Sequence, residues 1–212
     1  MIESGERHMM SGIKIFGITG PTGAGKSTVS EMFRKYGVYI ADADKAARRV
    51  TEKGGDCLYE LYREFGDGIL NSDGTLNRLA LGDIVFADPQ KLIILNRITH
   101  KYIKEYIERE INESGAALAA IDGAVIIGSP VMDMCDKLVV VMADRETRLC
   151  RIKERDGLTP EAAQLRISAQ LSDDEYLRHA DYVIYNNGQL EGDEIERICN
   201  EIKAEKKTCA AT

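Results

Sequence analysis

The stretch that decides the fold is Gly20-Pro21-Thr22-Gly23-Ala24-Gly25-Lys26-Ser27-Thr28. An apolar run at residues 13–18 precedes it and predicts a short buried strand. Residues 29–36 follow it and predict a helix with Val29, Phe33 and Tyr36 on one face. Glycine, four free positions, glycine, lysine and serine between a strand and a helix form the pattern of a phosphate-binding loop, or P-loop.

The residue types of this loop suit a polyphosphate ligand. Glycines let the backbone curl around a phosphate with its N–H groups turned inward. The start of the next helix adds unpaired N–H groups and a positive dipole end. Lys26 can reach the β and γ phosphates, and the Ser27 hydroxyl can ligate Mg²⁺. The strand before and the helix after argue against a chance match in a glycine-rich turn, so we predict nucleoside triphosphate binding.

Length and composition indicate one acidic α/β domain with an insertion or a small lid. The 212 residues carry a formal net charge of −7 and are 44% hydrophobic. The negative charge argues against nucleic acid as a partner, and no apolar run approaches the roughly 20 residues that span a bilayer. Five scattered cysteines without zinc or disulfide spacing favour a reducing, cytoplasmic setting. We interpret residues 1–12 as an N-terminal extension and residues 13–212 as the domain.

Strand and helix patterns alternate along the rest of the chain. This alternation favours a parallel β-sheet flanked by helices. Residues 54–112 show helices without strands and are interpreted as an inserted substrate subdomain, and residues 144–180 as a lid region. Further strands are predicted at residues 37–41, 117–122 (with an extension to 127 left open), 137–142 and 182–185. Further helices are predicted at residues 45–50, 56–65, 78–86, 89–112, 146–156, 160–171, 173–179 and 190–207.

Two carboxylates follow the second predicted strand. Asp42 and Asp44 stand where this strand ends, at the edge of a parallel sheet where ligands bind. An aspartate there can accept the proton of an acceptor hydroxyl or hold Mg²⁺ through water. Capping the next helix is the simpler role for an aspartate in this position. We predict that one of the two caps the helix and that Asp44 takes part in chemistry.

Arginines recur after the strand at residues 137–142. Arg148, Arg151 and Arg155 follow helical spacing and share one predicted face. A row of guanidinium groups suits a lid that closes on phosphates, and a solvated basic face paired with glutamates is the alternative. Asn187 follows the last strand in a predicted turn, and in a nucleotide kinase it is well placed to meet the adenine. His100 alone is weak evidence for catalysis, because a single histidine is more often structural.

These pieces together resemble the dephospho-CoA kinase family over residues 13–202. Many families share the P-loop, but the combination and order of the other motifs are far more specific. They are Asp42-Ala43-Asp44 with Ala47-Arg48, Asp73-Gly74-Thr75-Leu76-Asn77-Arg78, Ile98-Thr99-His100, residues 145–157, Ser168-Ala169-Gln170 and residues 180–188. The resemblance implies a P-loop kinase fold with a nucleotide core, a helical substrate subdomain and a lid.

The resemblance also implies a reaction and residue roles. Members transfer the γ-phosphate of ATP, used with Mg²⁺, to the ribose 3′-hydroxyl of dephospho-CoA, the last step of coenzyme A synthesis. By similarity Asp44 is the base, Arg151 is the lid arginine on the transferring phosphate, and Lys26 completes the catalytic set. Ser27 is the metal ligand. The expected ATP-binding residues are Thr22, Gly23, Ala24, Gly25, Lys26, Ser27, Thr28, Arg148 and Asn187. The expected acceptor-binding residues are Asp42, Arg48, Arg78 and His100.

Two departures from the family's pattern fall on the acceptor side. Lys101 stands where members usually have proline, and Ala124–Gly128 lacks their proline and glutamate. A carboxylate at Gly128 would add a contact to the acceptor, and Lys101 is a candidate for a compensating one. A P-loop kinase of another nucleotide or nucleoside, and a weakly active nucleotide-binding paralogue, therefore stay as alternatives. The sequence leaves the oligomeric state open.

Overall fold

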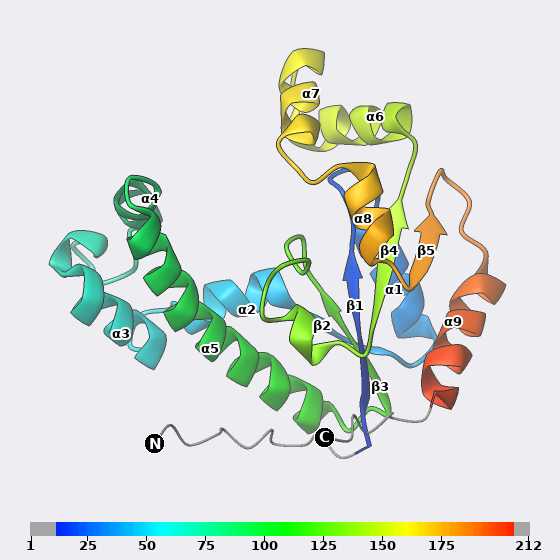
Figure 1. Ribbon diagram of the computed structural model, residues 1–212, viewed down its shortest axis with the longest axis horizontal. Helices are drawn as coiled ribbons and strands as arrows, with labels where there is room; N and C mark the ends of the chain where they lie inside the picture. Colours follow the sequence, from blue (N-terminus) through cyan, green and yellow to red (C-terminus); the bar gives the residue numbers. More distant parts are fainter. Residues whose placement is uncertain (1–11, 206–212) are drawn as a thin grey trace.

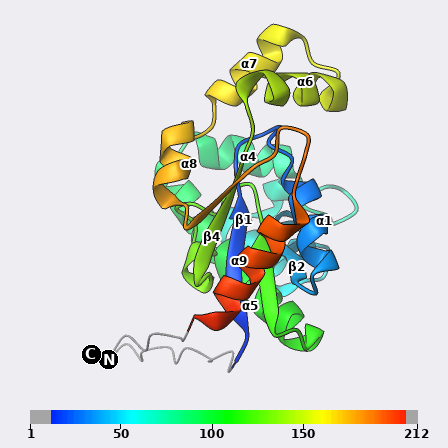
Figure 2. The same ribbon diagram turned by 90° about the vertical axis from the view of Figure 1, so that its right-hand side faces the viewer.

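The computed structural model describes residues 12–205 (Figures 1 and 2). Most of the predicted N-terminal extension, residues 1–11, lies outside this range, as do residues 206–212, which include the predicted end of the last helix. Within residues 12–205, no helix combines the length and the apolar composition that crossing a membrane requires.

In the described part of the chain, five strands form one sheet in which all neighbours pair in parallel. Across the sheet the order is β2-β3-β1-β4-β5, with β1 in the centre. Parallel pairing brings the carboxyl ends of the strands to one edge, where α/β proteins bind their ligands. The predicted α/β fold is thereby confirmed. The strands are β1 (Lys14–Thr19), β2 (Tyr39–Asp42), β3 (Leu118–Asp122), β4 (Lys137–Met142) and β5 (Tyr182–Tyr185).

Helices fill the connections between the strands (Figure 1). Their bounds agree with the predicted bounds to within a few residues, since both hydrophobic periodicity and capping residues mark them. The α-helices are α1 (Lys26–Lys35), α2 (Ala43–Val50), α3 (Asp56–Phe65), α4 (Arg78–Phe86), α5 (Pro89–Ser114), α6 (Arg145–Asp156), α7 (Pro160–Ser168), α8 (Asp173–His179) and α9 (Gly192–Ala204). Two short 3-10 helices are η1 (Asp67–Ile69) and η2 (Met132–Met134).

Side chains alternate along each strand, so both faces of the sheet are apolar and both are covered. Phe16 and Ile18 of β1 face a cluster that contains residues of α1 and α9. Ile15 faces the opposite cluster, to which α2 and α5 contribute. On that second side, Tyr176 of α8 packs against β4. The sheet is therefore the middle layer of three.

Strand β3 has the shorter of its two predicted lengths. The strand ends at Asp122, and the extension to residue 127 is absent. The N–H of Gly123 donates to the carbonyl of Ile18 at 3.2 Å, and beyond this bond the chain bends away from the sheet. The turn leaves the carboxylate of Asp122 at the ligand-binding edge.

Helices α3 and α4 pack against the first half of α5 around a core of their own (Figure 1). Further along α5, Ile107 and Ile111 pack under the sheet, so this helix belongs to both cores. Asp88 caps α5 by accepting a backbone N–H at 2.9 Å, and Pro89 stands at its first position. The substrate subdomain at residues 54–112 stays a prediction. The buried members of the separate core are Cys57, Leu61, Ile69, Leu81, Val85 and Ile98.

Helices α6 and α7 stand above the carboxyl edge of the sheet (Figure 1). They form a small cluster in which Ile152 of α6 packs with Ala163 and Ile167 of α7. Helix α8 belongs instead to the body of the fold, because Tyr176 packs on β4. Within the predicted lid region, residues 144–180, the part that projects is therefore the α6–α7 hairpin.

The contact between Phe16 and Phe33 is central to the core beneath α1. The ring centroids are 5.0 Å apart in an edge-to-face arrangement, and neither residue is exposed. We expect Phe33→Ala to lower the free energy of unfolding by about 3–5 kcal/mol, because it removes buried contacts and leaves a cavity. Equilibrium chemical denaturation measures this loss. The control is Phe86→Ala, at a residue that is 82% exposed, where a change below about 0.5 kcal/mol is expected. Equal losses of unfolding free energy in Phe33→Ala and Phe86→Ala would contradict the central place of the Phe16–Phe33 contact in the core.

Candidate active site

The P-loop joins β1 to α1 through backbone conformations that require glycine. Gly20 and Gly25 have φ angles of 148° and 85°, in the region that favours glycine. A Cβ on Gly20 would collide with the carbonyl oxygen of Val141, and one on Gly25 with the side-chain amide of Asn186. Gly25 is the N-cap of α1, so the N–H groups of Lys26 and Ser27 have no intrahelical carbonyl to bond. They are available to an anion.

Side chains from distant elements hold the carbonyl groups of the P-loop. Arg151 Nη1 donates to the carbonyls of Gly23 at 3.3 Å and Ala24 at 3.2 Å. The buried amide of Asn186 donates to those of Ala24 at 3.1 Å and Gly25 at 3.3 Å. Arg151 also donates to the backbone carbonyl of Asn186 at 2.9 Å. Because the N–H and C=O groups of a trans peptide point in opposite directions, fixing the carbonyls also orients the N–H groups.

Lys26 lies between the loop and the acidic edge of the sheet. Its Nζ donates to the carbonyl of Gly20 at 2.9 Å. Burial lowers the pKa of Lys26, while the carboxylates of Asp122 and Asp44 act in the opposite direction. An ammonium group has three donors, so the bond to Gly20 leaves Lys26 able to contact a phosphate as well.

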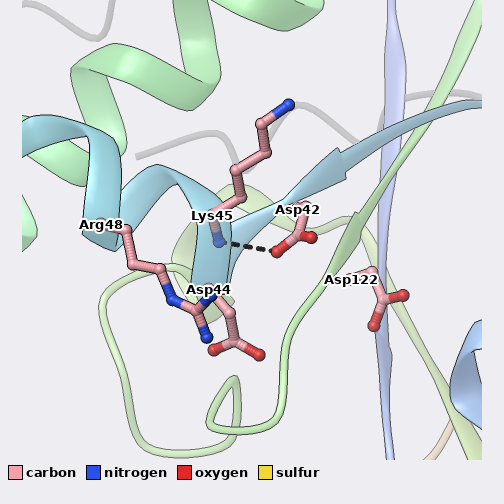
Figure 3. A pocket seen from close by; sticks show the side chains of 5 residues that line it. All are labelled: Asp42, Asp44, Lys45, Arg48 and Asp122. Atoms are coloured by element: carbon pink, nitrogen blue, oxygen red, sulfur yellow. Dashed lines mark hydrogen bonds between the residues drawn. The ribbon is translucent and has the colours of Figure 1, made fainter.

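Three aspartates meet in a cavity of about 420 Å³ at the carboxyl edge of the sheet (Figure 3). Asp42, Asp44 and Asp122 line it together with Lys45 and Arg48. Asp42 and Asp122 are partners in the register of β2 and β3, which explains why two strand ends deliver carboxylates to one place. Figure 3 shows Asp44 and Arg48 projecting from α2 toward the same space.

The two carboxylates after β2 have different contacts. Asp42 Oδ1 accepts the backbone N–H of Lys45 at 2.8 Å and caps α2. Asp44 lies in the first turn of this helix, with an exposed side chain. The prediction that one of the pair caps the helix is confirmed for Asp42. The chemical role of Asp44 stays a prediction.

Asp122 is a site residue that sequence reasoning missed. Its Oδ2 accepts the hydroxyl of Ser30 in α1 at 2.7 Å. Burial raises the pKa of Asp122 against the opposing effects of the Ser30 hydroxyl and the Lys26 ammonium. The available signal was its position at the end of a predicted buried strand, which is the same kind of position that drew attention to Asp42.

The three arginines of the predicted row point to different partners. Arg148 is 2% exposed, and its guanidinium donates to the carbonyl of Thr22 at 3.1 Å and pairs with Asp173 at 2.7 Å. Arg155 pairs with the residue that follows it, and Arg151 holds the P-loop carbonyls. Arg148 and Arg151 therefore both face the P-loop, whereas Arg155 pairs within its own helix, so the predicted shared face holds for two of the three arginines. The burial and partners of Arg148 favour a positioning role.

The turn after β5 contacts both the P-loop and α6. Asn187 Oδ1 accepts the backbone N–H of Asp144, just before α6, at 2.8 Å. Its predicted contact with adenine is not tested by this geometry and stays a prediction. The neighbouring Asn186, 4% exposed, belongs to the same predicted turn, and its contacts with the P-loop carbonyls were not predicted from the sequence.

The predicted acceptor-binding residues fall into two cavities on either side of α2. Asp42 and Arg48 line the acidic cavity. Arg78 and His100 line a mainly apolar cavity of about 320 Å³ between α2, α4 and α5. Arg78 Nη2 donates to the hydroxyl of Thr51 at 2.7 Å, and burial lowers the pKa of His100. Adjacent residues of α2 line both cavities, so a ligand with two chemically different parts could occupy the pair.

The two unusual positions on the acceptor side have distinct surroundings. The Lys101 ammonium lies 3.7 Å from a carboxylate oxygen of Glu60 and 4.7 Å from the centre of the Tyr102 ring. Lys101 is thus directed toward α3. Gly128 has a φ of 76°, and a Cβ there would meet no atom within 4 Å. A glutamate at Gly128 would have space but a strained backbone.

A family model described as dephospho-CoA kinase matches residues 14–192. The chain belongs to the dephospho-CoA kinase family. It is 44% identical over 181 residues to the dephospho-CoA kinase of Listeria monocytogenes serotype 4b (strain F2365), covering 84% of this chain and 90% of the relative. It is 38% identical over 197 residues to the dephospho-CoA kinase of Geobacter sulfurreducens, covering 92% of this chain and 99% of the relative.

Solved structures show the same architecture. TT1252 from Thermus thermophilus superposes with a TM-score of 0.75 at 29% identity, covering 92% of this chain and 99% of that one. A dephospho-CoA kinase from Campylobacter jejuni superposes with a TM-score of 0.60 at 26% identity, covering 89% and 96%. The resemblance inferred from the motifs, the P-loop kinase fold and the assignment as an enzyme, a kinase, are confirmed.

The buried carboxylate of Asp122 gives a stability prediction with a definite pH dependence. Its pKa is raised above 3.8 in the folded chain, so the folded state binds the proton more tightly and loses stability as pH rises through the raised pKa. Asp122→Asn keeps an acceptor for Ser30 without this loss. We expect the variant to be more stable than wild type at pH 8, and the difference to shrink toward pH 4.

Urea denaturation across this pH range measures the difference between Asp122→Asn and wild type. Asp83→Asn, at an exposed position of α4, is the control and should show no comparable trend. A less stable Asp122→Asn at pH 8 would mean that Lys26 and Ser30 more than compensate for the burial.

Proposed function

We propose that this chain transfers the γ-phosphoryl group of ATP to the ribose 3′-hydroxyl of dephospho-CoA, giving coenzyme A and ADP. The observation that carries the proposal is the convergence of three groups at one edge of the sheet. They are the P-loop with Lys26, the carboxylate of Asp44, and the guanidinium of Arg151. Family membership supports this choice among the reactions that P-loop kinases perform.

The ATP side of the reaction requires positive charge around the β and γ phosphates. The first N–H groups of α1 and the Lys26 ammonium supply it within the loop. Arg151 is half-buried beside the loop, and only one of its terminal nitrogens makes the bonds to Gly23 and Ala24. Nη2 also donates to Asn186 Oδ1, at 3.4 Å. The second N–H of Nη2 and the N–H of Nε can still serve charge that develops on the transferred group.

The residues present fit Mg²⁺ delivered with ATP. The hydroxyl of Ser27 is exposed at the start of α1, and Asp122 and Asp44 supply carboxylate oxygen nearby. Residues 12–205 contain no group of three His, Cys, Asp or Glu arranged for a metal. This suits an ion that takes most of its ligands from phosphate and water. When bound, Mg²⁺ neutralises phosphate charge, and we assign Ser27 and Asp122 to hold it.

The acceptor hydroxyl needs a base as its oxygen attacks the γ-phosphorus. Asp42 and Asp44 both line the acidic cavity, but Asp42 uses Oδ1 to cap α2. We assign the proton to Asp44: the hydroxyl O–H bond breaks toward its carboxylate, the new O–P bond forms, and the bond to the ADP oxygen breaks. Asp42 and Arg48 would face the acceptor nucleotide in this cavity. Arg78 and His100 would contact the acceptor in the adjacent apolar cavity.

A second candidate is a P-loop kinase with another nucleotide or nucleoside as acceptor. It is favoured by one observation, the Gly128 turn, where family resemblance leads one to expect a carboxylate. A panel of acceptors with ATP and Mg²⁺, followed by ADP release, separates the two candidates. We expect dephospho-CoA to give the highest kcat/KM, with AMP and adenosine well below it, and Lys26→Ala to be inactive with all of them. Turnover of another nucleotide but not of dephospho-CoA would overturn the proposal.

The assignment of the base predicts a specific separation of kinetic effects. Asp44→Asn should lower kcat by about 10²–10⁴-fold, because a positioned base contributes in this range. Its affinity for ATP, measured by calorimetry, should stay near that of wild type. Asp42→Asn should retain far more activity, since Asn is also a good N-cap. A larger loss of kcat in Asp42→Asn than in Asp44→Asn would reverse the two roles.

A further inference from the structure

The backbone of Thr22 is held on both sides by side chains from the region between β4 and β5. Gln170 Oε1 accepts the N–H of Thr22 at 2.7 Å. Arg148 Nε donates to the carbonyl of Thr22 at 3.1 Å. We call this pair of contacts the Thr22 clamp. Thr22 stands between two glycines of the P-loop with positive φ angles, Gly20 and Gly23.

The Arg148 side chain and the Gln170 backbone each have a further partner. Arg148 is 2% exposed, and its Nη1 donates to Asp173, the first residue of α8, at 2.7 Å. Gln170 lies between α7 and α8, and its own N–H donates to the carbonyl of Ile167 at 3.2 Å. The clamp therefore connects the P-loop to α6, to the end of α7 and to the start of α8.

Contacts that fix the backbone matter more for a glycine-rich loop than for other loops. Glycine has more backbone freedom than any other residue, so ordering a loop that contains several of them costs conformational entropy. If the loop were ordered only when ATP arrives, this cost would be subtracted from the binding free energy. Contacts that fix the loop beforehand remove the cost. A contact that fixes Thr22 acts on nucleotide binding without touching the nucleotide.

We propose that Gln170 is a positioning residue for nucleotide binding, which acts by accepting the Thr22 N–H and so holds the P-loop in its phosphate-binding shape. The inference rests on the proposed function, because it takes the P-loop as the ATP site. The side-chain oxygen of Gln170 accepts the N–H of Thr22, and the Arg148 guanidinium supplies positive charge at the carbonyl of the same residue.

The test compares two substitutions of similar length. Gln170→Met removes the acceptor and leaves the Thr22 N–H without its partner, so we expect the Kd for MgATP and the KM for ATP to rise roughly tenfold. Binding of the substrate and binding of the transition state should weaken by the same amount, so kcat should stay near the wild-type value. Gln170→Glu keeps an acceptor oxygen, and its added charge lies close to Arg148, so it should restore most of the affinity. Calorimetry and steady-state kinetics give these values.

Hydrogen exchange of the nucleotide-free protein tests the clamp directly. The peptide that covers residues 20–28 should exchange faster in Gln170→Met than in wild type, with Gln170→Glu close to wild type. The matched control is Gln164→Met on α7, where the side-chain amide hydrogen-bonds only to Ser168 among the described residues. This control should match wild type in exchange, Kd and KM.

Three different results would contradict three different parts of the argument. Faster unfolding of Gln170→Met with unchanged Kd, KM and exchange would overturn the inference and leave Gln170 with a merely structural role. Equal loss of affinity in Gln170→Glu and Gln170→Met would overturn the role of the acceptor oxygen. If wild type bound no MgATP, the proposed function itself would fall, whatever the exchange of residues 20–28 showed.

Discussion

A backbone that wraps a phosphate must turn its N–H groups to one side, and the carbonyls that point to the other side then need partners. In this chain the partners come from far along the sequence: Arg148 and Arg151 of α6 and Asn186 after β5. A buried polar group left without a partner costs about 1–3 kcal/mol. The shape of the P-loop and the positions of α6 and the β5–α9 turn therefore depend on one another.

The order of the strands explains the rest of the site. Because β1 lies at the centre of the sheet with β3 and β2 on one side, the loop that begins after β1 faces carboxylates delivered by both of those strands. Burial and the charges of Asp42 and Asp44 disfavour the ionised form of Asp122, while Ser30 and Lys26 favour it. Burial of the Asp122 carboxylate and the Lys26 ammonium is unfavourable for folding. The site exchanges some folding stability for binding, as functional sites commonly do.

Local patterns were sufficient to predict most of the fold. The P-loop, the apolar strands and the helix periodicity depend on neighbours in sequence, and so the elements fell within a few residues of their predicted bounds. The capping role of one aspartate could be predicted for the same reason. The directions of Arg148 and Arg151 could not, because the P-loop carbonyls that they contact are more than a hundred residues away. Arg155 differs, since it pairs with the next residue of its own helix. Asp122 and the P-loop contacts of Asn186 were missed because their neighbours in space, Ser30 and Ala24, are also distant in sequence.

Helix α5 has no glycine or proline after Pro89. Its 26 residues span about 39 Å at the usual rise of an α-helix, and they pass from the core of α3 and α4 to the underside of the sheet. Such a helix has no hinge where kinks normally occur, so a shift of α3 and α4 would be carried along α5 into the sheet. The apolar residues of the α6–α7 hairpin pack in a separate cluster, so α5 does not couple the hairpin in this way.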